Sequence, residues 1–326
     1  AWRVAAFGVL IYTAGLLSMA FVVTETGVFF GQVLIGMGLG SAGISIAVGA
    51  VARAAPPEKR SLAMGLVTSF GSFGQFALVP VAQIMMNEHG WQFAIVILSA
   101  IVASMVAVTL GMRVPAGGAR PLEGITQSAG SALRQATSSR DYILLTIGFF
   151  VCGLQLVFIT THLPTYLQDA GLSGEIASWS LALIGLFNII GAFMCGWLGG
   201  IVSKKKTLAI VYLLRGLIIA GFISLPASPA LALFFGAAMG LLWLGTIPLT
   251  SGLILAFFGP RHLSMLYGLV FLSHQIGSFA GAWLGGIWYD VFGNYEAMWW
   301  LNAAAGFFAF AVNWAIREPK PAAVPA

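Results

Sequence analysis

The segment LSMLYGLVFLSHQIGSFAGAWLGGIWYD, residues 263–290, indicates most directly how this chain folds. It contains no charged residue before its last position, and it is long enough to cross a hydrocarbon core of roughly 30 Å as one helix. Ser273, His274 and Gln275 lie near its middle, at a depth where polar groups need a hydrogen-bonding partner or a function. The segment therefore predicts a transmembrane helix with a polar centre.

The composition extends this prediction to the whole chain. Hydrophobic residues make up 59% of it and charged residues 8%, whereas an ordinary soluble domain has about 25% charged residues. The 41 glycines are spread through apolar runs, which suits helices that pack closely in lipid. We therefore expect an all-α integral membrane protein, in which Cys152 and Cys195 are small packing residues.

Hydropathy divides the chain into ten predicted spans. They lie at residues 4–23, 28–51, 62–86, 92–112, 142–166, 177–201, 207–225, 230–257, 263–288 and 297–316. The polar stretch 113–141 contains Gly, Ser and Pro, and it is predicted to be a linker. The predicted domains are an N-terminal half-bundle (1–112), this cytoplasmic linker, a C-terminal bundle (142–317) and a cytoplasmic tail (318–326).

The basic residues predict the orientation of the chain. Fourteen of the 15 Lys and Arg residues fall on one set of alternating span ends: Arg3, Arg53, Lys59, Arg60, Arg113, Arg120, Arg134, Arg140, Lys204, Lys205, Lys206, Arg261, Arg317 and Lys320. Positive residues favour the cytoplasmic side. Both termini of the chain are therefore predicted to be cytoplasmic, and the net charge of +5 is a topology signal and no sign of nucleic-acid binding.

An internal repeat predicts two related halves. MGLVTSFGSFGQF (64–76) aligns with YGLVFLSHQIGSF (267–279), which pairs Gly65 with Gly268 at an offset of 203 positions (268 − 65 = 203). The same offset relates the seventh span to the first, but the fifth and sixth spans have no counterpart. Parallel repeats are a feature of transporters. We therefore expect a pseudo-twofold, six-plus-six helix protein of which ten helices are present and the first two precede Ala1.

The loop GWLGGIVSKKK (196–206) resembles the loop between the eighth and ninth helices of the major facilitator superfamily (MFS). The resemblance covers essentially the whole chain, and it identifies the ten spans as helices 3 to 12 of a two-bundle fold. It implies a multi-pass, monomeric transporter of the bacterial inner membrane, with the lipid bilayer and a small molecule as partners, no cofactor and no enzymatic activity. The loop is then the candidate conformational switch, with residues Gly196, Gly200, Lys204, Lys205 and Lys206.

The segments WLGTIPLTSG (243–252) and SHQIGSFAG (273–281) are similar to bacterial monocarboxylate and oxalate:formate carriers. The chain also departs from known patterns. Gln32 replaces the superfamily's common Arg on the fourth helix, which disfavours drug efflux. The monocarboxylate carriers have an Asp and, four residues later, an Arg on the eighth helix, where LIGLFNIIGAF places Asn188 and Ala192. A carboxylate-binding Arg is therefore missing at its expected place.

Two ionisable residues near mid-membrane are candidates for substrate binding or coupling. Arg215 is the one Lys or Arg inside a predicted span. It would either anchor an anion or bond to backbone carbonyls of neighbouring helices, and we expect the second role because ninth helices of this superfamily usually lie outside the cavity. His274 is a candidate for proton coupling, because imidazole titrates near physiological pH. Its alternative is a neutral bond across helices, and its neighbour Gln275 could orient the ring.

Further candidates are uncharged at neutral pH. His162 is predicted near the outer surface, as a rim residue or a local structural contact. Gln155 and Asn188 lie near half depth and could join Trp243, Thr246 and Thr250 in a neutral hydrogen-bonding cavity, although each could equally join helices. The sequence contains no metal-binding or nucleophile motif, so neither a metal site nor a catalytic residue is predicted.

Together these features predict a secondary active transporter of a small organic solute that works by alternating access. Protons are the candidate coupling ion and an organic anion the candidate substrate. One alternative is an exporter of a neutral or amphipathic compound. The others are an intramembrane enzyme or sensor, and a truncated chain without transport activity.

Overall fold

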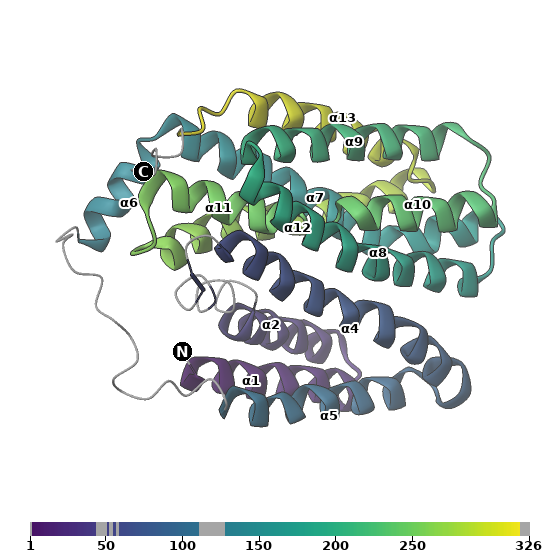
Figure 1. Ribbon diagram of the computed structural model, residues 1–326. Helices are drawn as coiled ribbons and strands as arrows, with labels where there is room; N and C mark the ends of the chain where they lie inside the picture. The colour runs from purple at the N-terminus through teal and green to yellow at the C-terminus, as the bar shows by residue number, and fades with distance from the viewer. Residues whose placement is uncertain (1, 44–50, 52–54, 57–58, 111–127, 320–326) are drawn as a thin grey trace. The chain divides into compact units, whose positions relative to one another are not determined.

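A computed structural model describes residues 2–43, 51, 55–56, 59–110 and 128–319 (Figure 1). These residues form α-helices and contain no strand. The chain divides into two compact units. Unit 1 comprises residues 1–50 and 78–126, and unit 2 comprises residues 51–77 and 127–326. The division of the chain into a half-bundle, a linker, a C-terminal bundle and a tail, as given in the sequence analysis, stays a prediction. Residues 111–127 of the linker region and 320–326 of the tail lie outside the described residues, as do Arg53, Arg113, Arg120 and Lys320.

Unit 1 is built from α1 (Trp2–Phe21), α2 (Glu25–Ala42), α5 (Trp91–Leu110) and the end of α4 (Arg60–His89). Helix α1 packs on both α2 and α5. Gly8 and Gly15 of α1 lie against Gly38 and Gly31 of α2, where an added Cβ atom would come within 3.0 Å of the opposite backbone. Contact of this closeness between glycine faces is how membrane helices associate when lipid supplies no hydrophobic drive.

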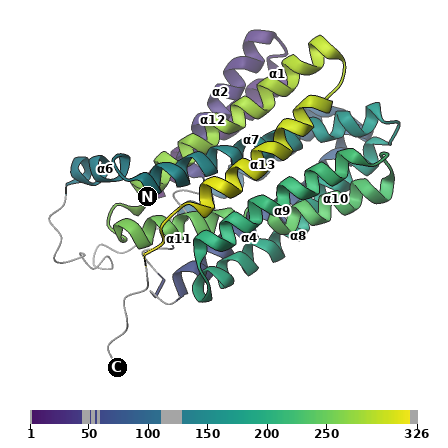
Figure 2. The same ribbon diagram turned by 90° about the horizontal axis from the view of Figure 1, so that it is seen from above.

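Unit 2 contains the start of α4 and eight further helices: α6 (Ala129–Thr137), α7 (Arg140–Asp169), α8 (Gly174–Ile201), α9 (Lys204–Ser224), α10 (Pro229–Leu242), α11 (Thr246–Phe258), α12 (Leu263–Phe292) and α13 (Glu296–Trp314). Its main helix pairs are α7 with α12, α8 with α10, and α9 with α13, as Figure 2 shows from above.

The pairing of α7 with α12 depends on small residues. Gly277 and Gly281 of α12 lie against the backbone of α7 at Phe150 and Leu154, and Gly153 of α7 lies against the carbonyl group of His274. Side chains larger than hydrogen would separate the two helices at these points. The polar centre of the segment 263–290 is thus brought directly onto α7.

The predicted span 230–257 consists of two helices, because α10 ends at Leu242 and α11 begins at Thr246. Pro248 explains the break, since proline has no N–H with which to bond the carbonyl four residues earlier and its ring clashes with that carbonyl. Gly245 lies in the connection. The backbone groups that the break frees must find partners inside the bundle.

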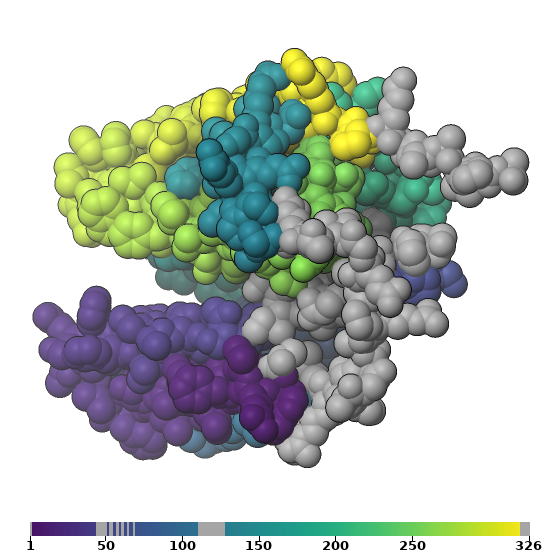
Figure 3. Space-filling view, turned by 90° about the vertical axis from the view of Figure 1, so that its left-hand side faces the viewer, coloured from purple at the N-terminus to yellow at the C-terminus, as the bar shows by residue number. Residues whose placement is uncertain are grey.

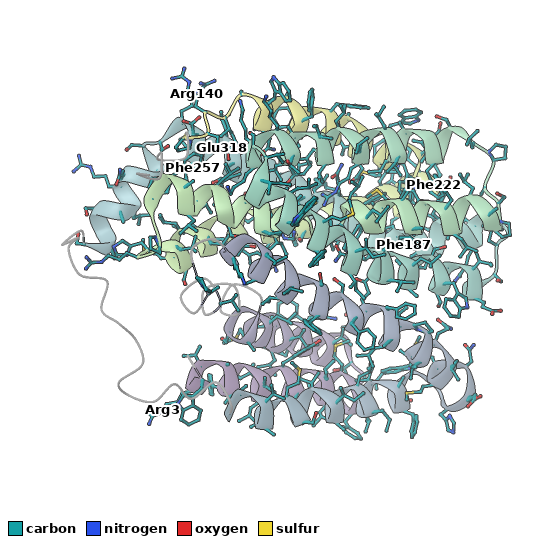
Figure 4. All side chains as sticks on the ribbon, in the orientation of Figure 1. Arg3, Arg140, Phe187, Phe222, Phe257 and Glu318 are labelled. Atoms are coloured by element: carbon teal, nitrogen blue, oxygen red, sulfur yellow. The ribbon has the colours of Figure 1, made fainter. Side chains whose placement is uncertain are left out.

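The basic ends of the unit 2 helices lie together. Figure 4 places Arg140, Phe257 and Glu318 toward one end of the unit and Phe222 toward the other. Figure 3 faces the former end, where α6 and the start of α7 lie in teal beside the last described residues in yellow. A hydrogen bond of 2.9 Å from the Arg317 amide to the Asp141 carboxylate joins these two segments. This arrangement agrees with the alternation of basic ends in the sequence.

Eight helical segments of the described chain are long and apolar enough to cross a membrane, with α10 and α11 counted as one. Helices α2 and α13 also coincide with predicted spans but are not among these eight. The all-α membrane class is therefore confirmed.

Candidate functional site

The break between α10 and α11 gathers four of the predicted site residues. Asn188 of α8 is fully buried, and its Oδ1 accepts a hydrogen bond of 2.8 Å from the amide of Leu244, inside the break. Its Nδ2 donates to Ser72 Oγ of α4 at 2.5 Å. Arg215 approaches the same break from α9, Trp243 lies in it, and Thr246 begins α11. Asn188 thus pairs a backbone N–H that the break frees.

Arg215 pairs the carbonyl groups of the break. Its Nε and Nη2 donate to the carbonyl oxygen of Leu242 at 3.1 and 2.7 Å, and Nη2 also donates to the carbonyl oxygen of Trp243. The guanidinium lies over the ring of Tyr212, 5.4 Å from its centroid. Cations are favourable at a helix C-terminus because of the helix dipole. Arg215 thus bonds to backbone carbonyls of a neighbouring helix, and its role in transport stays a prediction.

Cys152 of α7, which we expected to be a simple packing residue, is a member of the same cluster. Its sulfur accepts a hydrogen bond from Arg215 Nη1 at 3.4 Å and lies 3.4 Å from Thr246 Oγ1. Tyr212 and Tyr267 are buried beside it. The one sequence signal of this cluster is that Tyr212 and Arg215 are three residues apart, which places them on one helix face.

His274 lies on α12 at the edge of this cluster and is 8% exposed. Its ring stacks on Phe271 at a centroid distance of 5.3 Å, and it also interacts with the Cys152 side chain. Its Nδ1 is 3.1 Å from Oε1 of Gln275, which is itself exposed, and 3.4 Å from Ser278 Oγ. The structure therefore places His274, but not Gln275, with the buried polar residues of the bundle.

Gln155 and His162 of α7 form hydrogen bonds with other helices. Gln155 is fully buried, and its Nε2 donates to the carbonyl oxygen of Asn302 on α13 at 2.9 Å. His162 Nε2 is 2.9 Å from the carbonyl oxygen of Ala282, and its Nδ1 is 3.2 Å from the Tyr295 hydroxyl. Burial raises the pKa of Tyr295, so that hydroxyl stays neutral at physiological pH. Both side chains therefore join helices.

Hydrogen bonds join the predicted switch loop to Glu318, which follows α13. Both Glu318 oxygens accept hydrogen bonds from the start of α9: from the Lys204 and Lys205 amides at 3.1 and 3.2 Å, and from Ser203 Oγ at 2.6 Å. Lys205 Nζ donates to the Trp314 carbonyl oxygen at 3.0 Å. Lys206 is exposed. A carboxylate at a helix N-terminus is stabilised by the free amides and the helix dipole.

The two glycines of the loop differ in their surroundings. Gly196 is buried, and its Cα would lie 3.2 Å from a Cβ added at Gly65 of α4. Gly200 is exposed and has open space around it. Close packing thus favours a small residue at Gly65, opposite Gly196, whereas Gly200 has space for a larger side chain.

These features define a polytopic helical membrane protein with a buried polar cluster and no recognisable catalytic set among the described residues. The family model described as Major Facilitator Superfamily matches residues 1–249 and 171–326. The chain belongs to the major facilitator superfamily. Members of this family are transporters and not enzymes, and they bind small molecules, sometimes together with protons.

Two curated relatives illustrate the similarity. The uncharacterized MFS-type transporter YcxA of Bacillus subtilis (strain 168) is 26% identical over 243 residues, which cover 72% of this chain and 59% of the relative. Monocarboxylate transporter 13 of Rattus norvegicus is 28% identical over 263 residues, which cover 78% of this chain and 58% of the relative. The chain thus spans less than two thirds of the length of these relatives.

A solved structure shows the same fold. The crystal structure of a variant of the fucose:proton symporter FucP of E. coli superposes with a TM-score of 0.71 at 16% identity, covering 98% of this chain and 84% of that chain. At this identity the likeness concerns the fold alone.

Proposed function

We propose that this chain is part of a secondary active transporter that moves a small organic anion, together with protons, by alternating access. One observation carries the proposal: Arg215 is a fully buried cation in the middle of a membrane helix, and no carboxylate of the described residues lies beside it. Every Asp and Glu of α7 to α13 lies in the first or last turn of its helix.

With no described carboxylate beside it, the guanidinium of Arg215 makes the bundle interior electropositive whenever it has no anionic partner. Insertion of an Arg at mid-membrane costs about 2.5–3.5 kcal/mol, and the carbonyl dipoles of Leu242 and Trp243 offset this only in part. A positive interior with low-dielectric walls attracts anions and repels cations. The names of several relatives, among them monocarboxylate transporters 11, 12 and 13, agree with a small carboxylate as the substrate class.

His274 supports protons as the coupling ion. It is a largely buried imidazole on α12, and it lies beside the Arg215 cluster. Imidazole is the side chain whose ordinary titration range includes neutral pH, which suits reversible proton binding. We further propose that the chain is monomeric, that it resides in the plasma membrane, and that the end of unit 2 with Arg140 and Glu318 is cytoplasmic.

Proteoliposome transport tests this proposal. The protein with any residues that precede Ala1 in its gene is reconstituted and assayed with labelled monocarboxylates, dicarboxylates, neutral sugars and alcohols, with and without an inward proton gradient. We expect one carboxylate class to accumulate only when the gradient is imposed. Gradient-independent transport of neutral solutes alone would overturn the proposal.

Export of a neutral or amphipathic compound is the second candidate. The hydrogen-bonding pattern of Arg215 favours it, because Nε and Nη2 are directed at backbone carbonyls and the side chain is fully buried. The guanidinium would then serve the fold alone. The same solute panel distinguishes the two functions.

A further inference from the structure

The sulfur of Cys152 is surrounded by hydrogen-bond donors. Arg215 Nη1 donates to it at 3.4 Å, and the Thr246 hydroxyl lies at the same distance. The hydroxyl groups of Tyr212 and Tyr267 are buried near the sulfur, and neither has a carbonyl or carboxylate partner among the described residues. No carbonyl or carboxylate oxygen is among these neighbours. This environment suits a hydrogen-bond acceptor, and the sulfur of a neutral thiol is a weak hydrogen-bond acceptor.

The balance of charges around Arg215 also favours a negatively charged Cys152. An anionic partner would stabilise Arg215 at mid-membrane, and each acidic side chain of α7 to α13 lies in the first or last turn of its helix. Cys152 is the ionisable side chain within hydrogen-bond distance of the guanidinium, and both residues are fully buried. Thiols adjacent to Arg or His readily ionise to thiolates.

We propose that Cys152 is the internal counter-ion of Arg215, held as a thiolate, and that it accepts the coupling proton through His274. The coupling part of this inference rests on the proposed function, whereas the charge state of Cys152 does not.

The proton transfer is balanced. In the unloaded state the thiolate pairs with Arg215. A proton that enters from solvent binds to His274, and transfer to Cys152 breaks the N–H bond and forms an S–H bond, which leaves the imidazole neutral. Release reverses these two changes, and no electrons are exchanged. Protonation removes the anionic partner of Arg215, which leaves its positive charge free to attract the substrate anion. It also weakens one contact at the α10–α11 break, which links proton binding to the shape of the bundle.

The groups around Cys152 come from three helices. Tyr212 and Arg215 face it from α9, Thr246 from α11, and Tyr267 and His274 from α12. Cys195 of α8 is the second cysteine of the chain. It is buried and lies near Arg215, but among the described residues it forms no hydrogen bond with it. Cys195 therefore offers a matched control.

Infrared spectroscopy of the S–H stretching band tests the charge state. When Cys195 and any cysteine that precedes Ala1 are replaced by serine, Cys152 is the sole thiol. We then expect its band to be absent at neutral pH and to appear on acidification or after Arg215→Gln. A band that is already present at neutral pH with Arg215 intact would overturn the inference. This measurement uses folded protein and does not depend on transport.

Transport of a Cys152→Ser protein tests the coupling role. Serine retains a hydrogen-bonding group but does not ionise, so we expect solute exchange across the membrane to continue while accumulation driven by the proton gradient is lost. Cys195→Ser should retain both activities. Full gradient-driven accumulation by Cys152→Ser would contradict the coupling role. If the unmodified protein transports without any response to the gradient, the proposed coupling itself fails, and the infrared result still decides the charge state.

Discussion

Replacement of Gly277 by alanine adds one methyl group at the contact between α7 and α12. The added Cβ atom would lie 2.9 Å from the carbonyl carbon of Phe150 and 3.1 Å from the amide nitrogen of Leu154, and it would lie closer still to the Phe150 carbonyl oxygen. Backbone atoms cannot rotate away as a side chain can, so the two helices must separate.

Gly286 of the same helix has no atom within 4 Å of its Cβ position, so Gly286→Ala is the matched control. Both variants gain the same helix propensity, about 1 kcal/mol, which cancels when they are compared. The remaining difference in the free energy of unfolding between the two variants is the cost of overpacking. We estimate this cost as about 2–3 kcal/mol, the upper part of the usual range, because the contacts are with backbone atoms. At roughly 2–4 °C per kcal/mol, Gly277→Ala should melt about 4–12 °C below Gly286→Ala.

The assay is intrinsic tryptophan fluorescence during heating in detergent, with monodisperse protein confirmed beforehand by size-exclusion chromatography. Equal midpoints for the two variants would refute the close contact of α7 with α12. The contact matters for function, because the His274 carbonyl lies against Gly153 and a displaced α12 would move His274 relative to Cys152.

Three further substitutions test the roles assigned to other residues. Asn188→Leu leaves the Leu244 amide unpaired at the helix break, and thermal unfolding should report a loss of about 1–3 kcal/mol; an unchanged midpoint would mean that Asn188 does not stabilise the break. Glu318→Ala removes the carboxylate from the start of α9 and should lower stability by about 1–2 kcal/mol, an effect that high salt reduces, whereas the exposed Glu175→Ala should change it less. His162→Phe should lower the melting temperature but leave the pH dependence of uptake unchanged, because both ring nitrogens contact neighbouring groups; a shifted pH profile would instead give His162 a part in coupling.

The membrane class and most helix positions could be predicted, since apolar runs and the alternation of basic ends depend on local composition. The family was predicted from the resemblance of the loop 196–206 to a known superfamily. The segment 263–290 behaves as its pattern indicated, because α12 covers residues 263–292. Bonding of Arg215 to backbone carbonyls was one of two roles predicted for it, and its role in transport stays a prediction. These features need no knowledge of which helices are neighbours.

The cluster at the helix break could not be predicted in the same way. Cys152, Arg215 and Thr246 lie on three helices, and hydropathy does not specify how each helix is rotated about its axis. Pro248 and Gly245 were the local signal of the break between α10 and α11, but proline is tolerated within many membrane helices, so the segment 230–257 was predicted as one span. The link between Glu318 and the switch loop joins residues more than 100 positions apart.

The central claim is that the buried positive charge of Arg215 serves the transport of a small organic acid with protons. The most direct measurement is uptake of a labelled monocarboxylate into proteoliposomes that contain the full-length protein, recorded with an inward, an absent and an outward proton gradient. We predict accumulation with the inward gradient, equilibration without a gradient and exclusion with the outward gradient, together with loss of accumulation after Arg215→Gln. Uptake that is equal under all three conditions, or that Arg215→Gln leaves unchanged in a folded protein, would contradict the claim.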